Sequence, residues 1–332
     1  MLYIFDHTTD PYWNLAAEEY LFKNFSQPIF RLWQNDNAII IGMHQNALAE
    51  INLGYVRENK IKVVRRISGG GAVFHDLGNL NFTFIDNRIK DEESSAMFAR
   101  FTKPIILALG KLGIDAYLEG RNDLLTDGRK FSGNAVAVYK NRILQHGTLL
   151  FSSSMKDLSK ALAGRPEKFV SKSVKSNISR VTNISEHLKQ PMTIKEFCSF
   201  IEKEITGTDK YERYYYTESD LKAIEQLKET KYSEDWWNLG SSPHYEFSKV
   251  TQFPGGLVEL YMEVTKGKIS DLKIFGSYFF TKDTKDIEEL LKGCEHTQEA
   301  IMKRLKTINL SHYFTNITEE EFITLFWDQA AI

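Results

Sequence analysis

Hydrophobic and polar positions recur along the chain with two different periods, which predicts an α+β protein. From Leu80 to Phe84, apolar residues alternate with Asn81 and Thr83, and this period of two predicts a strand with one buried face. Residues 95–113 carry apolar side chains at helical spacing instead. By the same criteria we expect further strands at 2–5, 30–33 and 38–42 and in the block 121–151, and helices at 15–22, 47–59, 156–163, 193–206 and 217–230.

Local signals mark several turns and ends. Asp127-Gly128 is a strong two-residue hairpin signal, and Lys140-Asn141 is a weaker one. Asn14 precedes an apolar run and is expected to cap the first helix. Residues 168–185 are rich in Ser, Lys and Asn and lack periodicity, so we expect a long surface loop there.

The chain is longer than a single core usually allows. Its 332 residues make two domains the expectation. Beyond residue 250 the pattern changes to strands at 257–264 and 269–280, followed by helices at 285–291, 297–306 and 318–327. A hairpin with three helices has the size of a small domain. We therefore place a large domain at 1–244 and a small α/β domain at 245–332.

Composition and charge narrow the classes of function. The chain is 42% hydrophobic with a formal net charge of −2, so it lacks the overall basic field expected for nucleic-acid binding. Cys198 and Cys294 lie far apart without metal-site spacing, which fits a reducing compartment. The N-terminus does not resemble a signal peptide, and no apolar run approaches the ~20 residues that span a bilayer. We expect a soluble cytoplasmic protein that binds neither nucleic acid nor a membrane.

The run Val63 to Asp76 carries the strongest chemical signal. Arg65 and Arg66 lead into Ser68 and three consecutive glycines, with strand-like residues on both sides. Glycines let backbone N–H groups converge on a ligand, and guanidinium groups suit phosphate or carboxylate. The run has neither the Lys-Ser/Thr pair of a P-loop nor the spaced glycines of a dinucleotide fold. It predicts a strand, a glycine turn and a strand around a local anion site; a tight hairpin that merely carries arginines is the simpler alternative.

The Asp127-Gly128 hairpin supplies a second candidate site. The turn sets the opposite pairs Thr126–Arg129, Leu125–Lys130, Leu124–Phe131 and Asp123–Ser132. Asp123 and Lys130 then share one face of the sheet. A fixed ammonium group stabilises the charge that develops on an α-phosphate during adenylation, and a carboxylate can hold Mg²⁺. The alternative is an exposed sheet face with a solvated lysine.

One question of register decides whether His146 belongs to this site. If Lys140-Asn141 closes a two-residue hairpin, His146 pairs with Ala135 and lies on the face opposite Lys130. A bulge at Gly133-Asn134 would bring His146 to the same face as Lys130. Without a bulge, His146 lies outside the site.

Several separated blocks, in the same order, resemble the signature of the lipoate–protein ligase family. They are Asn14-Leu15-Ala16 with Glu18-Glu19, the run Arg65 to Asp76 with Gly78 to Phe82, Gly120 to Leu124, Gly128 to Ala135, His146 to Leu150, Ser179 to Ile184 and Trp237 to Pro243. The resemblance covers essentially the whole chain, including a small C-terminal domain like that of the bacterial two-domain members. One departure is at Ser277-Tyr278, which stand where many members carry Asp-Phe.

The resemblance implies a fold and a reaction. The fold is the mixed, largely antiparallel sheet flanked by helices that lipoate ligases share with biotin ligases and class II tRNA synthetases. The enzyme would use ATP and Mg²⁺ to convert lipoate to lipoyl-AMP and pyrophosphate. The lipoyl group would then pass to a lysine of a carrier, which is a lipoyl domain of a 2-oxoacid dehydrogenase E2 subunit or the glycine-cleavage H protein. A monomer is implied as well.

The resemblance also assigns roles to individual positions. Its nucleotide contacts fall on Arg66, Gly71, Ala72, Val73, Phe74 and Lys130. Together with the chemistry of the hairpin, this makes Lys130 and Asp123 the expected catalytic pair, with Asp123 also the expected Mg²⁺ ligand. The expected substrate-binding positions are Ser68, Gly70, His75, Asn122, Ser132, Gly133 and His146.

Two other functions stay open on the sequence. An octanoyl- or lipoyl-transferase of the same fold would act without ATP and commonly through a cysteine, whereas Cys198 and Cys294 fall outside both motif blocks. A non-catalytic relative would bind lipoate or a carrier without turnover. The sequence does not distinguish a preference for lipoate from one for octanoate, and it does not identify the physiological carrier.

Overall fold

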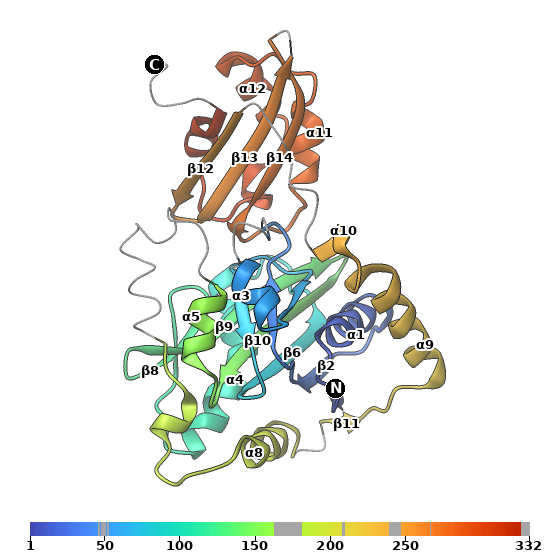
Figure 1. The fold of residues 1–332 in the computed structure, drawn as a ribbon, viewed down its shortest axis with the longest axis vertical. Helices are drawn as coiled ribbons and strands as arrows, with labels where there is room; N and C mark the ends of the chain where they lie inside the picture. Colours follow the sequence, from blue (N-terminus) through green and yellow to red (C-terminus); the bar gives the residue numbers. More distant parts are fainter. Residues whose placement is uncertain are drawn as a thin grey trace.

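The computed structural model describes residues 1–45, 47, 51, 53–162, 181–207, 210–238, 247–265 and 267–326. These residues form a larger body around an extended sheet and a smaller body built from the C-terminal elements, one above the other in Figure 1. None of the described helices is long and apolar enough to cross a lipid bilayer.

The larger body is organised by an eight-stranded sheet. The β1–β2 and β1–β11 pairs are parallel and all other neighbouring pairs are antiparallel, which confirms the predicted mixed, largely antiparallel sheet. In spatial order the strands are β11 (Glu212–Arg213), β1 (Leu2–Phe5), β2 (Ile29–Trp33), β6 (Asn79–Asn87), β10 (Arg142–Leu150), β9 (Arg129–Tyr139), β8 (Asp123–Thr126) and β7 (Tyr117–Glu119).

Both predicted two-residue hairpins form. Asp127 and Gly128 have φ angles of 49° and 70°, as a turn with two left-handed residues requires. Lys140 has a φ of 51°, and Tyr139 pairs with Arg142 across that turn. His146 consequently pairs with Ala135, as predicted.

A β-bulge corrects the predicted register between β8 and β9. The pairs next to the turn, Thr126–Arg129 and Leu125–Lys130, are confirmed. Beyond them the register shifts, and the observed pairs are Leu124–Ser132 and Asp123–Gly133, so the predicted pairs Leu124–Phe131 and Asp123–Ser132 were wrong. The extra residue is Phe131, whose fully buried ring is part of the main core. One extra residue reverses the facing of everything after it. Ala135 and its partner His146 therefore share the face of Lys130.

A second, three-stranded sheet holds the glycine-rich run. Its strands are β4 (Lys62–Arg65), β3 (Ala38–Ile41) and β5 (Val73–His75), in that spatial order. The two predicted strands on either side of the glycines are confirmed. They do not pair with each other, because β3 lies between them, parallel to β4 and antiparallel to β5. The glycine segment therefore crosses over the end of β3, and the simpler hairpin alternative was wrong.

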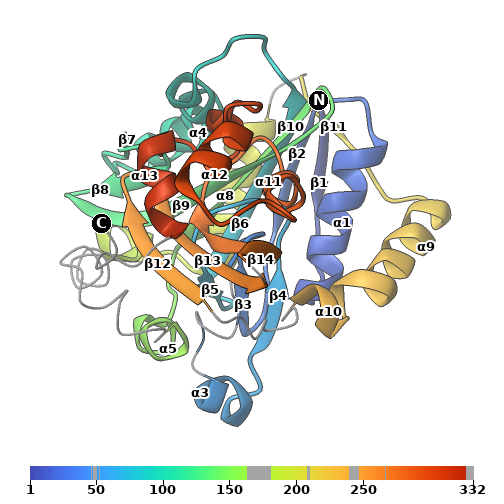
Figure 2. The ribbon, with the colours of Figure 1, turned by 90° about the horizontal axis from the view of Figure 1, so that it is seen from above.

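Helices cover both faces of the large sheet. Helices α4 (Ser94–Lys111) and α8 (Ile194–Thr206) pack on the face that carries Phe82 and Phe84. Helix α1 (Pro11–Asn24) covers the opposite face, and Figure 2 shows it beside the parallel strands. Strand β6 is buried from Asn79 to Ile85 on both faces, so the prediction of a single buried face was wrong.

The start of α1 differs from the prediction. Asp10 caps the helix by accepting a hydrogen bond from the Tyr12 N–H, and Pro11 occupies the first helical position, where no N–H is needed. Asn14, the predicted cap, lies inside the helix and is fully buried. Its amide serves a buried hydrogen-bond network instead of a helix end.

The helices predicted at 47–59, 156–163 and 217–230 correspond to Leu53–Glu58, Met155–Ala161 and Glu218–Leu227, whereas the short helix at Asp235–Asn238 was not predicted. The predicted segments at 47–59, 156–163 and 168–185 lie partly outside the described residues. The described elements are α3 (Leu53–Glu58), α5 (Met155–Ala161), the 3-10 helix η1 (Ile184–His187), α9 (Glu218–Leu227), the π-helix η2 (Lys228–Tyr232) and α10 (Asp235–Asn238).

The smaller body has a separate hydrophobic core. The predicted hairpin is confirmed as β13 (Gly256–Thr265) and β14 (Lys268–Tyr278), and the sequence missed a third strand, β12 (Phe247–Phe253), whose side chains are mostly only half-buried. The helical elements are α11 (Lys285–Leu291), α12 (Gln298–Leu305), η3 (Leu310–His312), α13 (Glu319–Ile323) and η4 (Thr324–Phe326). The proposed boundary at 244/245 lies outside the described residues.

Candidate active site

A cavity of about 370 Å³ lies between the large sheet, helix α1, the glycine segment and the smaller body. It contains most of the residues selected from the sequence, namely Arg66, Gly70, Gly71, Ala72, Val73, His75, Asn122, Asp123, Lys130, Gly133 and His146. Residues of both motif blocks thus line one cavity.

Three predicted site residues do not line the cavity. Ser68 is fully buried behind His146, and its Oγ lies 2.6 Å from His146 Nε2. Phe74 packs into a core cluster with Ile39 and Ile41. Ser132 is fully buried, and its Oγ accepts a hydrogen bond from Asn134 Nδ2. The bulge at Phe131 places Ser132 on the side away from Lys130.

The sequence also missed residues that line the cavity. They are Leu15, Trp33, Ile40, Asn81, Asn134, Ala135, Gly147, Thr148, Ser277 and Phe279. Trp33 and Asn81 pair across β2 and β6, and Asn81 pairs with Thr148 on β10, so these three form one row on the sheet. The alternation of Asn81 and Thr83 with apolar residues could have identified this row from the sequence. It marks a polar face that is covered by α1 and opens into the cavity.

Arg66 holds the glycine segment in place. Its Nη2 donates hydrogen bonds to the carbonyl oxygens of Gly69 and Gly71 at 2.6 and 2.8 Å. Its Nη1 donates to the Ile40 carbonyl and its Nε donates to Ser68 Oγ. Burial lowers the pKa of Arg66 to about 10, so the guanidinium stays charged at neutral pH. Most of its donors are used to shape the loop, and the same side chain also lines the cavity.

Gly42 leaves the space that this loop needs. A Cβ at Gly42 would lie 2.1 Å from the Gly70 carbonyl oxygen, and Gly70 has a φ of +92° that a side chain would strain. We expect Gly42→Ala to lower the free energy of unfolding by about 1–3 kcal/mol, since the backbone must move. Urea denaturation measures the change.

A matched substitution controls for the extra methyl group. Gly110 lies inside α4, and a Cβ there would meet nothing within 4 Å. Gly110→Ala should raise the free energy of unfolding by up to about 1 kcal/mol. Equal effects of the two variants would contradict the close approach of Gly42 to Gly70.

Lys130 and Asp123 form an ion pair in the wall of the cavity. Lys130 Nζ lies 2.8 Å from Asp123 Oδ1, and the two side chains are 37% and 36% exposed. A pair this exposed contributes little stability and can exchange partners with a ligand at small cost. The main chain of Lys130 is fixed on the other side, where its carbonyl accepts a hydrogen bond from the Thr182 N–H. The ammonium group is therefore held at the cavity without being committed to a buried partner.

The donors at this ion pair suit a magnesium ion that arrives with phosphate. Asp123 is the one carboxylate among the described residues that line the cavity. No group of three or more His, Cys, Asp or Glu in the described part of the chain could hold a metal. Mg²⁺ is commonly held by one or two carboxylates together with substrate phosphates. The residues present therefore fit Mg²⁺ bound jointly by Asp123 and phosphate oxygens.

A buried polar chain supports His146. Its Nδ1 lies 2.9 Å from Glu18 Oε2, and Glu18 also accepts a hydrogen bond from Thr83 Oγ1 at 2.7 Å. Burial alone would raise the pKa of Glu18, but the nearby His146 and Arg31 outweigh it and lower that pKa. Glu18 stays ionised and orients the imidazole. The sequence marked Glu18 only as part of a family block.

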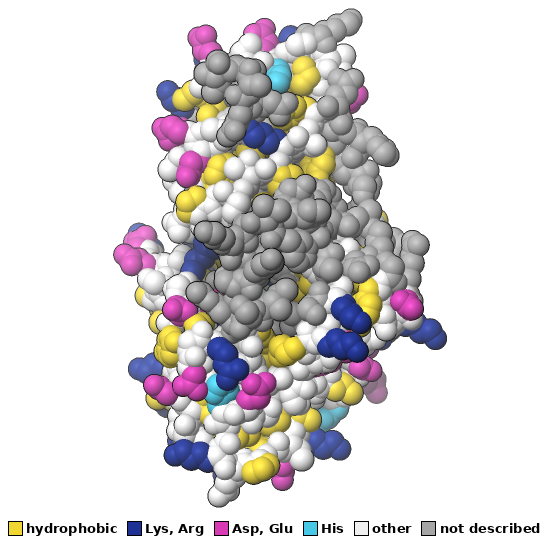
Figure 3. All heavy atoms as spheres, turned by 60° about the vertical axis from the view of Figure 1, so that its left-hand side comes forward, with side chains coloured by type: hydrophobic (Ala, Val, Ile, Leu, Met, Phe, Trp, Pro, Cys, Tyr) yellow, Lys and Arg dark blue, Asp and Glu magenta, His cyan; other side chains and the backbone are white. Residues whose placement is uncertain are grey.

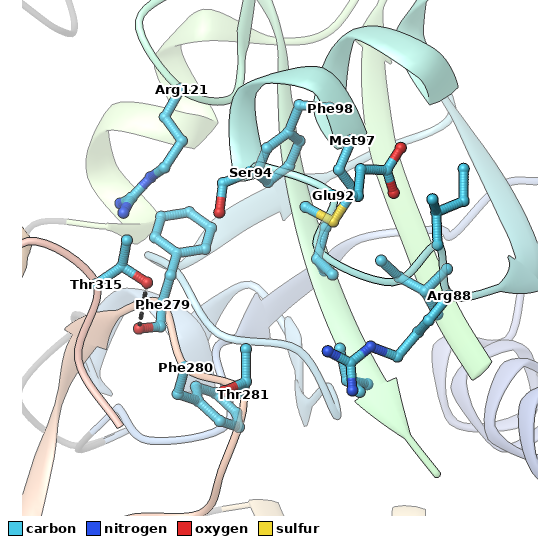
Figure 4. A pocket seen from close by; sticks show the side chains of 14 residues that line it. Arg88, Glu92, Ser94, Met97, Phe98, Arg121, Phe279, Phe280, Thr281 and Thr315 are labelled. Atoms are coloured by element: carbon cyan, nitrogen blue, oxygen red, sulfur yellow. Dashed lines mark hydrogen bonds between the residues drawn. The ribbon is translucent and has the colours of Figure 1, made fainter. Parts of the chain in front are cut away.

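The smaller body closes one side of the site. Ser277 and Phe279 line the cavity, and the Gly70 N–H lies 3.4 Å from the Tyr278 carbonyl oxygen. Phe279 also lines a second, smaller cavity of about 110 Å³ between the two bodies (Figure 4). There the Arg121 guanidinium lies 3.7 Å from the centre of the Phe279 ring. The Phe275 to Phe280 segment, which includes the expected departure at Ser277-Tyr278, thus lines both cavities.

Comparison with known protein families gives two matches. Residues 10–206 match the Lipoyl protein ligase A/B catalytic domain, and residues 242–326 match the Bacterial lipoate protein ligase C-terminus. The chain is 46% identical to lipoate-protein ligase LplJ of Bacillus subtilis over 96% of this chain and 97% of that protein. It is 43% identical to lipoate–protein ligase 1 of Staphylococcus aureus over 96% of this chain and 98% of that protein.

Solved structures agree with these matches. The Plasmodium falciparum LipL1 complex with lipoate superposes with a TM-score of 0.78 and 26% identity, covering 97% of both chains. A lipoate-protein ligase A bound with ATP gives a TM-score of 0.62 and 28% identity, covering 72% of this chain and 98% of that one. A bi-partite lipoate protein ligase from Thermoplasma acidophilum, studied with its E2 lipoyl domain, gives a TM-score of 0.64 and 30% identity. The match covers 74% of this chain and 98% of that one.

Proposed function

This chain belongs to the lipoate–protein ligase family, and from that premise we propose the reaction that its cavity carries out. Lipoate and ATP react to give lipoyl-AMP and pyrophosphate. The lipoyl group then passes from the adenylate to the side-chain amine of a carrier lysine, with release of AMP. Lipoate and ATP binding are supported by the related structures that hold these molecules.

The observation that carries the proposal is the position of Lys130. Its ammonium group lines the same cavity as the glycine segment that Arg66 holds. Among the described residues, its ion-pair partner is Asp123, whose side chain is half-exposed. As the lipoate carboxylate attacks the α-phosphate, negative charge builds on the phosphate oxygens, and a fixed cation stabilises that charge. Mg²⁺ on Asp123 and the phosphates would neutralise the pyrophosphate leaving group.

The same cation serves the second step. Once the adenylate has formed, Lys130 can polarise the acyl carbonyl while the carrier amine attacks it. We propose that the carrier is a lipoyl domain of an E2 subunit or the glycine-cleavage H protein. Figure 3 shows acidic and basic side chains interspersed over one face of the molecule, so the described residues of that face display no continuous basic field toward one class of carrier.

The two cysteines favour a ligase over a cysteine-dependent acyltransferase. Cys198 is buried in the core on α8, and Cys294 is buried in the core of the smaller body. Burial raises the pKa of Cys198 to about 11, which makes the thiolate rare at neutral pH. Neither cysteine lines the cavity. An acyl intermediate on a thiolate has no candidate among the described cavity residues.

Transfer to a carrier tests the proposal. Purified protein is incubated with lipoate, ATP, Mg²⁺ and a panel of lipoyl domains and H protein, and the mass of each carrier is measured. We expect a gain of one lipoyl group that requires ATP and the acceptor lysine. Modification without ATP from an acylated donor protein would support the transferase instead. Lipoate binding with no modification of any carrier would indicate a non-catalytic relative.

The cytoplasmic location, the monomeric state and the division into domains at 1–244 and 245–332 stay predictions.

A further inference from the structure

The cavity has two chemically different ends, and the fold fixes which end receives which part of the substrate. Asp123 lies on β8, Lys130 on β9, Asn81 on β6 and Trp33 on β2. The two ends lie on the outer strands of the row β2, β6, β10, β9 and β8, so four spacings of about 4.8 Å place β2 roughly 19 Å from β8. If the carboxylate of an acyl substrate reacts beside Lys130, its tail extends toward β2.

At the β2 end two nitrogen atoms lack partners. His75 Nε2 and Asn81 Nδ2 are buried and have no hydrogen-bond partner within the described chain. His75 and Asn81 are 3% and 1% exposed, and both line the cavity. Apolar side chains also line the cavity, including Trp33, whose ring centre lies 6.2 Å from that of His75. Unpaired buried donors are costly, so a ligand that satisfies them is favoured.

A chain of hydrogen bonds fixes His75 Nε2 as a donor. Arg31 is fully buried and can only donate, and its Nη2 lies 2.9 Å from Asn14 Oδ1. The Asn14 amide nitrogen therefore faces Asn35 Oδ1 at 3.0 Å, which turns the Asn35 nitrogen toward His75 Nδ1 at 3.1 Å. Because Nδ1 must accept this bond, a neutral His75 carries its proton on Nε2.

His75 stays neutral at working pH. Burial, together with the charges of Arg66 and His146, lowers the pKa of His75 to about 3. Asn81 presents a second donor, because its Oδ1 already accepts a hydrogen bond from Asn79 Nδ2 at 2.9 Å. Two N–H donors therefore face the tail of an acyl substrate at this end of the cavity.

We propose that His75 and Asn81 are specificity residues that select an acyl tail carrying a hydrogen-bond acceptor over a plain hydrocarbon tail. This inference rests on the proposed function. The dithiolane sulfurs of lipoate have lone pairs and are weak acceptors, whereas octanoate offers none. An octanoyl tail would leave both donors unpaired, and a site built to hydrogen-bond its substrate discriminates against such an analogue. Arg31, Asn14 and Asn35 act as positioning residues that orient the imidazole.

The test compares three acids on the wild-type protein. They are lipoate, octanoate and 5-cyclopentylpentanoate, a carbocyclic analogue in which carbons replace the two sulfurs. Affinity is measured by titration calorimetry, and kcat/KM by ATP–pyrophosphate exchange. We expect lipoate to exceed the carbocycle about tenfold in both, the effect of one neutral hydrogen bond of about 1.4 kcal/mol. Equal affinity for lipoate and the carbocycle would overturn the inference.

Two variants then assign the preference to residues. His75→Phe and Asn81→Leu should each lower kcat/KM for lipoate and raise it for octanoate and the carbocycle, so that the ratio falls about tenfold. The exposed His7, changed to Phe, is the matched control and should alter none of the three. A uniform loss for all acids is what structural damage produces, and it would contradict a specificity role. If wild-type exchange fails with every acid although lipoate binds, the proposed function fails, and calorimetry still decides the present inference.

Discussion

Replacement of Lys130 by alanine is expected to lower the rate of lipoyl-AMP formation about 100- to 1,000-fold, the usual cost of removing one electrostatic contact to a transition state. Lys130 lines the cavity with its Nζ 2.8 Å from Asp123 Oδ1, and we propose that this ammonium group stabilises the charge on the α-phosphate. The fold should survive, because both side chains are more than one-third exposed and water can solvate the Asp123 carboxylate left behind. The measurement is the single-turnover yield of lipoyl-AMP from lipoate and ATP.

Lys222→Ala is the matched control for this variant. Lys222 lies on α9 with an exposed side chain, away from the cavity. It should retain the wild-type rate. Thermal unfolding of all three proteins establishes that Lys130→Ala is folded. Adenylate formation at the wild-type rate by folded Lys130→Ala would remove the residue from the mechanism.

Asp6→Ala is expected to lower the free energy of unfolding by about 3–5 kcal/mol, because it leaves a buried charge without its partner. Asp6 forms a hydrogen-bonded ion pair with Arg31, whose side chain is 0% exposed. Arg31 also holds the backbone and side-chain oxygens of Asn14, so the damage extends into the network that orients His75. Urea denaturation followed by circular dichroism gives the change.

An exposed ion pair provides the comparison. Lys111 and Glu204 also form a salt bridge, but the Lys111 side chain is 65% exposed. Glu204→Ala should therefore change the free energy of unfolding by less than about 1 kcal/mol. Similar losses in the two variants would show that burial of Arg31 does not set the strength of its pair.

Local chemistry made much of this fold predictable. The Asp127-Gly128 turn needs two residues that tolerate positive φ, and at the start of α13 Thr318 and Glu321 form a capping box, which is also a short-range sequence signal. Such features depend on a few neighbouring residues. For the same reason the pairing of Lys130 with Leu125, next to the turn, followed directly from the sequence.

Features set by distant contacts were not predictable. The bulge at Phe131 exists because its ring is buried in the core, and this single residue decides that His146 faces the same cavity as Lys130. Asn14 has the chemistry of a helix cap, yet Arg31 and Asn35 hold it inside α1. The sequence did not show whether the strands on either side of the glycine segment pair with each other, and in the structure β3 lies between them. These residues contact partners that are distant in the sequence and become neighbours only in the folded chain.

The most direct test of the central claim is ATP–pyrophosphate exchange in the absence of any carrier protein. Labelled pyrophosphate is added to purified protein with ATP and Mg²⁺, with and without lipoate. If the cavity forms lipoyl-AMP, label enters ATP only when lipoate is present, and Lys130→Ala slows that entry at least 100-fold. Lipoate binding without lipoate-dependent exchange would contradict the proposal that this cavity adenylates its substrate.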